Sequence, residues 1–139
     1  MKKEIRTVVY DDELRLDACR FEGIVQPFPN HFHEYYVIGF MEAGERVLSC
    51  KNQEYAITKG HVLLFTPGDP HACVQSDGGT LDYRGLSIAQ EVMLDLVEEV
   101  TGRRELPRFT QNVIFDEEAA CCLRPLHELV MRVIASDKM

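Results

Sequence analysis

The feature that most limits the fold of this 139-residue chain is a series of short β-prone segments between Leu14 and Ile88. Turn-forming residues separate the segments at intervals of about ten residues, a spacing typical of antiparallel sandwiches and barrels. The β-prone segments are 14–21, 35–41, 46–50, 54–58, 62–65, 71–75 and 81–88. The sequence therefore predicts one mainly β domain built from antiparallel strands.

The segments on either side of this β region have different patterns. Residues 1–13 combine a β-prone run with an acidic turn, which predicts an N-terminal arm or an edge strand. Beyond the β region, apolar residues recur at helical spacing up to Gly102, and a second apolar stripe follows Asp116, which can cap a helix. The expected plan is an arm (1–13), a β barrel (14–88) and a helical segment (89–139).

Proline residues give two further expectations. Pro27 and Pro29 interrupt the β pattern, so residues 23–30 are expected to form a loop. Pro125 lies inside the second helical stripe. Because proline in a helix interior costs about 3 kcal/mol, we expect either a kink or a break at that position.

The composition of the chain argues against nucleic acid and membranes as binding partners. Asp and Glu exceed Lys and Arg, giving a net charge of −8, and such a surface would repel a phosphate backbone. There is no run of about 18 apolar residues and no signal-peptide pattern, so no membrane partner and a cytoplasmic location are expected. The five cysteines show no CxxC spacing, which predicts reduced, buried thiols.

Three of the five histidines lie at the two ends of one stretch of the chain. His31 and His33 are two residues apart, so an extended backbone turns both side chains to the same face. His71 follows the tight turn at residues 66–70. If the flanking strands pair, the three imidazoles converge on one cavity, which could hold a transition metal or a small organic ligand. The simpler interpretation is that the histidines only hydrogen-bond loop carbonyls and cap the turn.

These histidine-bearing segments resemble two signatures of the cupin superfamily, whose fold is a double-stranded β-helix or jelly roll. The signatures are His31-x-His33 and Gly60-x5-Thr66-Pro67-Gly68-Asp69-Pro70-His71. The full order, with HxHE, a buried strand ending in Glu-x-Gly and two C-terminal helices, is similar to the N-terminal effector-binding and dimerisation domain of AraC-type transcription regulators. The resemblance covers nearly the whole chain.

The resemblance implies a small-molecule-sensing and dimerisation domain of an AraC-family transcription regulator, which is not an enzyme. Its fold would be a cupin jelly roll followed by two α-helices. In that family a pair of helix-turn-helix motifs follows such a domain. These residues do not contain the motifs, so DNA binding is expected only through a domain that is not present here.

The residues around the expected cavity and the family's pairing of its helices indicate two binding surfaces. The effector, a sugar or a small acid, would enter the jelly roll, and the second helix would pair with its copy in a homodimer. The candidate ligand-binding residues are His31, His33, Tyr35, His71, Tyr83 and Arg84. The candidate dimer residues are Leu123, Leu126, Val130, Val133 and Ile134.

The main alternative is a small metal-dependent cupin enzyme, of the dioxygenase or sugar isomerase type, that uses the same three histidines. Metal-binding cupins add a carboxylate four or five residues after the second histidine, and those positions are Val37 and Ile38 here. Glu34 is out of phase on a straight strand. No cofactor is therefore favoured, with a divalent transition metal as the alternative. A third interpretation is an oligomerisation module with a filled barrel.

Overall fold

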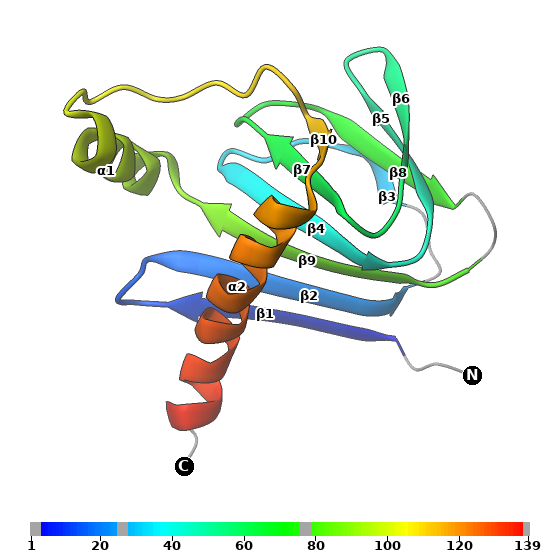
Figure 1. Cartoon of the computed structure of the whole chain (residues 1–139), viewed down its shortest axis with the longest axis horizontal. Coiled ribbons are helices and arrows are strands. Elements are labelled where there is room, and N and C mark those ends of the chain that lie inside the picture. The colour runs from blue at the N-terminus through cyan, green and yellow to red at the C-terminus, as the bar shows by residue number, and fades with distance from the viewer. Residues whose placement is uncertain (1–3, 25–27, 76–78, 138–139) are drawn as a thin grey trace.

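Two antiparallel sheets face each other, and a long helix crosses the outer surface of the larger sheet (Figure 1). The structure is a computed structural model that describes residues 4–24, 28–75 and 79–137. The side chains of residues 74, 75 and 132–137 lie outside that description.

The larger sheet has six strands in the order β1-β2-β9-β4-β7-β10, and the smaller has four in the order β3-β8-β5-β6. The larger sheet consists of β1 (Ile5–Asp11), β2 (Leu16–Ile24), β9 (Leu81–Ile88), β4 (Tyr36–Ala43), β7 (His61–Phe65) and β10 (Val113–Phe115). The smaller sheet consists of β3 (Phe28–His31), β8 (His71–Gln75), β5 (Arg46–Cys50) and β6 (Gln53–Ile57). The helices are α1 (Gln90–Thr101) and α2 (Glu117–Asp137). The predicted mainly β fold with two C-terminal helices is confirmed.

Two of these strands are absent from the expectations above. The predicted loop at residues 23–30 is wrong at both of its described ends: residues 23 and 24 belong to β2, and residues 28–30 belong to β3, which pairs with β8 at the edge of the smaller sheet. Residues 25–27 lie outside the described residues. An edge strand accommodates Pro29 because one side of it needs no ladder hydrogen bond. The segment 89–139, expected to be helical, also contains β10, which pairs with β7.

Both helices have the end residues that the sequence indicates. Gly102 closes α1 in the left-handed conformation, with φ of 81°, and its N–H donates to the carbonyl of Glu98. Asp116 caps α2, because its Oδ1 accepts the N–H of Ala119 at 3.0 Å. α2 continues through Pro125, so a break there is ruled out. None of the helices in the described residues is long and apolar enough to span a membrane.

The apolar stripe of α2 packs on the larger sheet of its own chain. Val130 is fully buried (0% exposed) in a cluster with Val9, Ala18 and Leu86. The side chain of Val130 therefore has no surface to offer a partner, which corrects its place among the dimer residues. Leu123 and Leu126 are half-buried against the same cluster, whereas the side chains of Val133 and Ile134 lie outside the described residues.

The cysteines divide between the barrel and the surface. All five are free thiols. Cys50 is buried and Cys19 and Cys73 are half-buried, in agreement with packed thiols. Cys121 and Cys122 are exposed on α2, so the expectation of burial is wrong for this pair, which lies away from the face that packs on the sheet.

Candidate functional site

A cavity of about 240 Å³ lies between the two sheets. Its walls come from both sheets and are mostly apolar, with Leu48 and Phe28 from the smaller sheet and Val37, Met41 and Leu63 from the larger one. Small barrels hold either side chains or one small ligand. Side chains do not fill this barrel, so it has room for a ligand.

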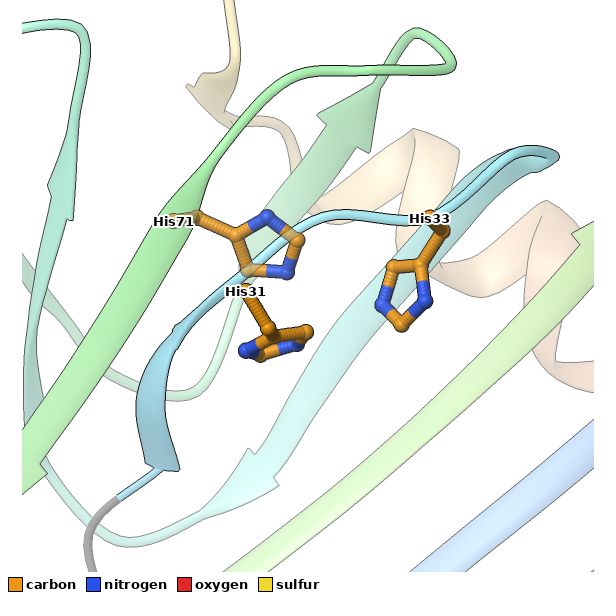
Figure 2. A group of neighbouring side chains, drawn as sticks. All are labelled: His31, His33 and His71. Carbon is orange, nitrogen blue, oxygen red and sulfur yellow. The ribbon is translucent and has the colours of Figure 1, made fainter.

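Three of the residues that line the cavity are histidines, and Figure 2 shows their rings close together. His31 ends β3, His71 begins β8, and the two residues are directly paired across the strands. The ring centroids of His31 and His71 are 4.3 Å apart, and that of His33 lies 5.4 Å from His71. One nitrogen of each ring lies within 4.8 Å of the others. The structure thus brings together the three residues that the sequence singled out.

The turn before His71 holds this cluster in place. The N–H of Gly68, which has φ of 89°, donates to the carbonyl of His33 at 2.8 Å and so joins the loop of His33 to the turn. Within the turn, Oδ2 of Asp69 accepts hydrogen bonds from the N–H of Thr66 at 3.0 Å and from Nδ2 of Asn112 at 3.1 Å. The left-handed backbone explains why glycine occupies position 68.

Hydrogen bonds to backbone carbonyls fix the tautomers of two of the rings. Nδ1 of His71 lies 3.0 Å from the carbonyl of Asp69, and Nδ1 of His31 lies 2.7 Å from that of Pro29. A carbonyl only accepts, so each Nδ1 carries the proton and each neutral ring keeps an unprotonated Nε2. The capping role foreseen in the simpler interpretation is therefore present, and it leaves Nε2 of both rings for another contact.

The environment favours the neutral form of His33 and His71. The pKa of His71 is lowered to about 4, chiefly by burial and also by the neighbouring His31 and His33, while the hydrogen bond to Asp69 acts in the opposite direction. Burial and His31 likewise lower the pKa of His33. The ring of Phe65 stacks on His71 with centroids 3.8 Å apart. At neutral pH the cluster can accept hydrogen bonds or ligate a metal.

Tyr35 and Tyr83 both line the cavity, as the sequence suggested. Tyr35 stacks on His33 with ring centroids 4.8 Å apart. The ring of Tyr83 lies across the sheet over two paired glycines, because a Cβ on Gly39 would come within 2.0 Å of its hydroxyl and one on Gly85 within 3.0 Å. The glycines therefore make the space that lets Tyr83 form the floor of the cavity.

Arg84 does not belong to the cavity. Neighbouring residues of a strand face opposite sides of the sheet, so Tyr83 faces inward and Arg84 faces outward, where its Nε lies 3.7 Å from Oδ1 of Asp82. The prediction of Arg84 as a ligand-binding residue is therefore wrong. The sequence alone left the phase of this strand open.

Arg46 is a buried charged residue of the cavity wall that the sequence analysis missed. Its side chain is only 1% exposed, lines the cavity, and donates from Nη2 to the carbonyl of Ile24 at 2.8 Å. The strand pattern held a usable signal, since Leu48 and Cys50 are apolar positions on the same face as Arg46. Asp17, Cys19 and Ser87 also line the cavity and were not named beforehand.

The donor set for a metal consists of imidazoles. Among the described residues the group comprises the three histidines without a carboxylate. Val37 lines the cavity at a position where metal-binding cupins place an acid, and Glu34 is exposed. The three histidines could bind a metal ion, and the hydrogen bonds at Nδ1 are the supporting contacts that metal-ligating histidines need.

Comparison with known families decides what kind of domain this is. Residues 17–137 match the family described as the AraC-like ligand binding domain. The chain belongs to this family. An AraC-like ligand binding domain agrees with the jelly roll, the cavity between the sheets and the two C-terminal helices described above.

A curated relative is described as a transcriptional regulator. The AraC-like domain is 50% identical over 130 residues to an uncharacterized HTH-type transcriptional regulator, YbfI, of Bacillus subtilis (strain 168). The match includes 94% of this chain and 47% of the relative. The chain thus spans about half the length of the curated relative that it matches.

Solved structures share the fold at low sequence identity. An RmlC-like cupin family protein of Methanocaldococcus jannaschii, which has a double-stranded β-helix fold, aligns with a TM-score of 0.55 and 13% identity over 64% of this chain and 83% of that protein. DMSP lyase DddQ of Ruegeria pomeroyi aligns with a TM-score of 0.53 and 18% identity over 63% of this chain and 47% of the lyase. The fold is therefore shared with a cupin family protein and with a lyase, so it does not by itself indicate an activity.

Proposed function

We propose that this AraC-like domain is the effector sensor of a transcription regulator and that a small molecule binds in the cavity between its two sheets. The observation that carries the proposal is the 240 Å³ cavity, which combines apolar walls with convergent polar groups at its ends. Such a combination is the usual form of a small-molecule site. The effector would be a sugar or a small acid, and DNA would be bound in the cytoplasm by the remainder of a longer polypeptide.

The hydrogen bond between α2 and β2 offers a route from the cavity to the helices. The side chain of Cys19 lines the cavity, while its backbone carbonyl accepts a hydrogen bond from Nε2 of His127 at 2.7 Å. His127 is itself buried, at 1% exposed. A ligand that shifts the balance between two positions of β2 would therefore shift α2 as well.

We also propose that the domain forms a homodimer through α2. Leu129 is 52% exposed on this helix, near the half-buried Leu126. We expect these exposed apolar side chains to pair across a two-fold axis. Sedimentation equilibrium at micromolar concentration tests this, and a monomeric mass would count against it.

A ligand screen with a blocked variant tests the sensing function. Thermal unfolding of the purified chain would be followed against a panel of sugars and small acids, and a true effector is expected to raise the melting temperature with concentration. Cys73→Phe would fill the cavity from its wall and should abolish the response. The control is Cys122→Phe on the exposed surface of α2, which should retain it. A panel with no stabilising compound would argue for the oligomerisation module instead.

The second candidate function is a metal-dependent enzyme, and the convergence of His31, His33 and His71 is the observation that favours it. A divalent transition metal held by these three rings would act there as a Lewis acid. Elemental analysis of the purified chain tests this candidate, with His33→Ala as the matched variant. Near-stoichiometric metal that the variant loses would support the enzyme, and metal-free protein with an intact fold would contradict it.

A further inference from the structure

Arg46 places a positive charge in the wall of the cavity, at the end opposite the histidines. Across the smaller sheet, Arg46 pairs with Gln75 whereas Cys50 pairs with His71. Arg46 and Cys50 are four residues apart on β5, which corresponds to about 13 Å at a rise of roughly 3.3 Å per residue. The cavity therefore has two polar ends of different chemistry, imidazoles at one and a guanidinium at the other.

The guanidinium of Arg46 is held in an apolar environment. Its carbon lies 6.0 Å from the centre of the Phe28 ring, and its side chain is 1% exposed. A charge in such surroundings interacts strongly with an opposite charge, because little water screens it. The planar fork of a guanidinium also matches the two oxygens of a carboxylate.

The wall between the two ends is apolar and largely aromatic. Phe21 stacks with Phe28 at a centroid distance of 6.1 Å and lies 6.2 Å from Tyr83, and Leu48 borders the same space. A hydroxyl group of a sugar that lay against Phe21, Phe28 or Leu48 would lose water without gaining a hydrogen-bond partner, which is costly. A volume of 240 Å³ also lies below the range of about 300–1,000 Å³ that holds drug-sized ligands.

We infer that the effector is a small monocarboxylic acid with an apolar, ring-sized body, whose carboxylate binds the guanidinium of Arg46 and whose body lies against Phe21, Phe28 and Leu48. This inference rests on the sensing function proposed above and specifies the class of its ligand. The other end of the acid reaches toward the histidine cluster, where neutral imidazoles accept a hydrogen bond from a hydroxyl or amide group.

Matched acids and amides test this inference. Benzoate, phenylacetate and 3-phenylpropanoate would be titrated calorimetrically into the purified chain at pH 7.5, each beside its neutral amide, with arabinose and glucose as a separate arm. At that pH the acids are fully ionised. We expect at least one acid to bind at least ten times more tightly than its amide.

Two variants of Arg46 and one control complete the test. Arg46→Gln should remove the preference for the acid by tenfold or more, and Arg46→Lys, which keeps the charge, should retain a preference at lower affinity. The control is Arg84→Gln, which changes an arginine on the outer face of the larger sheet and should leave the preference unchanged. Should Arg46→Gln not fold, the acid-to-amide ratio of the unmodified chain and of Arg46→Lys decides the outcome.

Several results would overturn the inference. Equal affinity for acid and amide, or an acid preference that survives in folded Arg46→Gln, would remove the role of Arg46. Failure of every acid at millimolar concentration would reject the acid class. Binding of an amide or a sugar in place of the acids would reject the class and leave the sensing function intact, so the two failures are distinguishable.

Discussion

The two faces of the six-stranded sheet have opposite uses. On the outer face, α2 covers a closely packed layer in which Phe40, Val62 and Val130 are at most 1% exposed. On the inner face, the same strands leave a space of 240 Å³ between the sheets. Packing to full density contributes stability, so this difference indicates that the outer face holds the fold together while the inner face leaves room for binding.

The largest expected difference between the faces comes from two leucines of β9. Leu86 packs under α2 and Leu81 borders the cavity, and both are nearly fully buried. We expect Leu86→Ala to lower the free energy of unfolding by about 4 kcal/mol and Leu81→Ala by about 2 kcal/mol, because Leu81 already has empty space on one side. Urea titrations measure both values. Equal losses would show that the two faces are equally well packed.

Acidification should lower the free energy of unfolding through His71, which lies on the cavity side of the molecule. The folded pKa of His71 is about 4, below the ordinary 6.5, so the unfolded chain binds more protons between these values. The contribution of His71 is therefore complete above pH 6.5 and falls as the pH approaches 4, with a loss of about 2 kcal/mol between pH 7.5 and 5. Urea titrations at the two pH values measure this loss, and in His71→Gln it should be smaller. An unchanged pH dependence in the variant would show that His71 is not the group responsible.

The outer face has its own buried histidine, His127, and its hydrogen bond to Cys19 sharpens the comparison. His127→Leu leaves the carbonyl of Cys19 without its donor, and we expect a loss of about 1–2 kcal/mol in the free energy of unfolding. His127→Gln can still donate from its amide and should lose less. If the two variants are equally stable, the hydrogen bond contributes little and the helix is held by apolar packing alone.

The smallest effect is expected at the rim of the outer face. Nη2 of Arg124 lies 2.6 Å from Oε1 of Glu42, and the arginine side chain is 31% exposed. Because water and salt screen such a pair, Arg124→Gln should cost less than about 1 kcal/mol. Added salt should reduce the difference between the variant and the unmodified chain further. A larger loss would show that this ion pair contributes as much stability as the buried contacts of the outer face.

The sequence predicts the fold better than it predicts the site. Turn residues at regular spacing and the segment from Gly60 to His71 are local signals, and local signals are enough to predict where most of the strands lie along the chain. The convergence of His31 and His71 followed from the same reasoning. β3 escaped prediction because Pro29 reads as a strand breaker unless the strand is known to lie at an edge.

The misassigned site residues have a common physical cause. Tyr83 and Arg84 are neighbours, and alternation shows that they face opposite sides of a sheet without showing which side is the inner one. Arg46 was missed because arginine on a strand normally faces water. The apolar stripe that contains Val130 could have covered either its own sheet or a partner. Only the three-dimensional packing shows that Val130 lies against its own sheet.

The ring of Tyr83 over Gly39 and Gly85 makes the cavity adjustable from a single position. Beneath that ring the sheet presents backbone without side chains, so a smaller residue at position 83 would deepen the chamber down to the strands. A library restricted to this one codon would therefore scan the size of accepted molecules while the histidine cluster, Arg46 and the helix contacts stay in place. The domain is in this respect a convenient starting point for building sensors of new compounds.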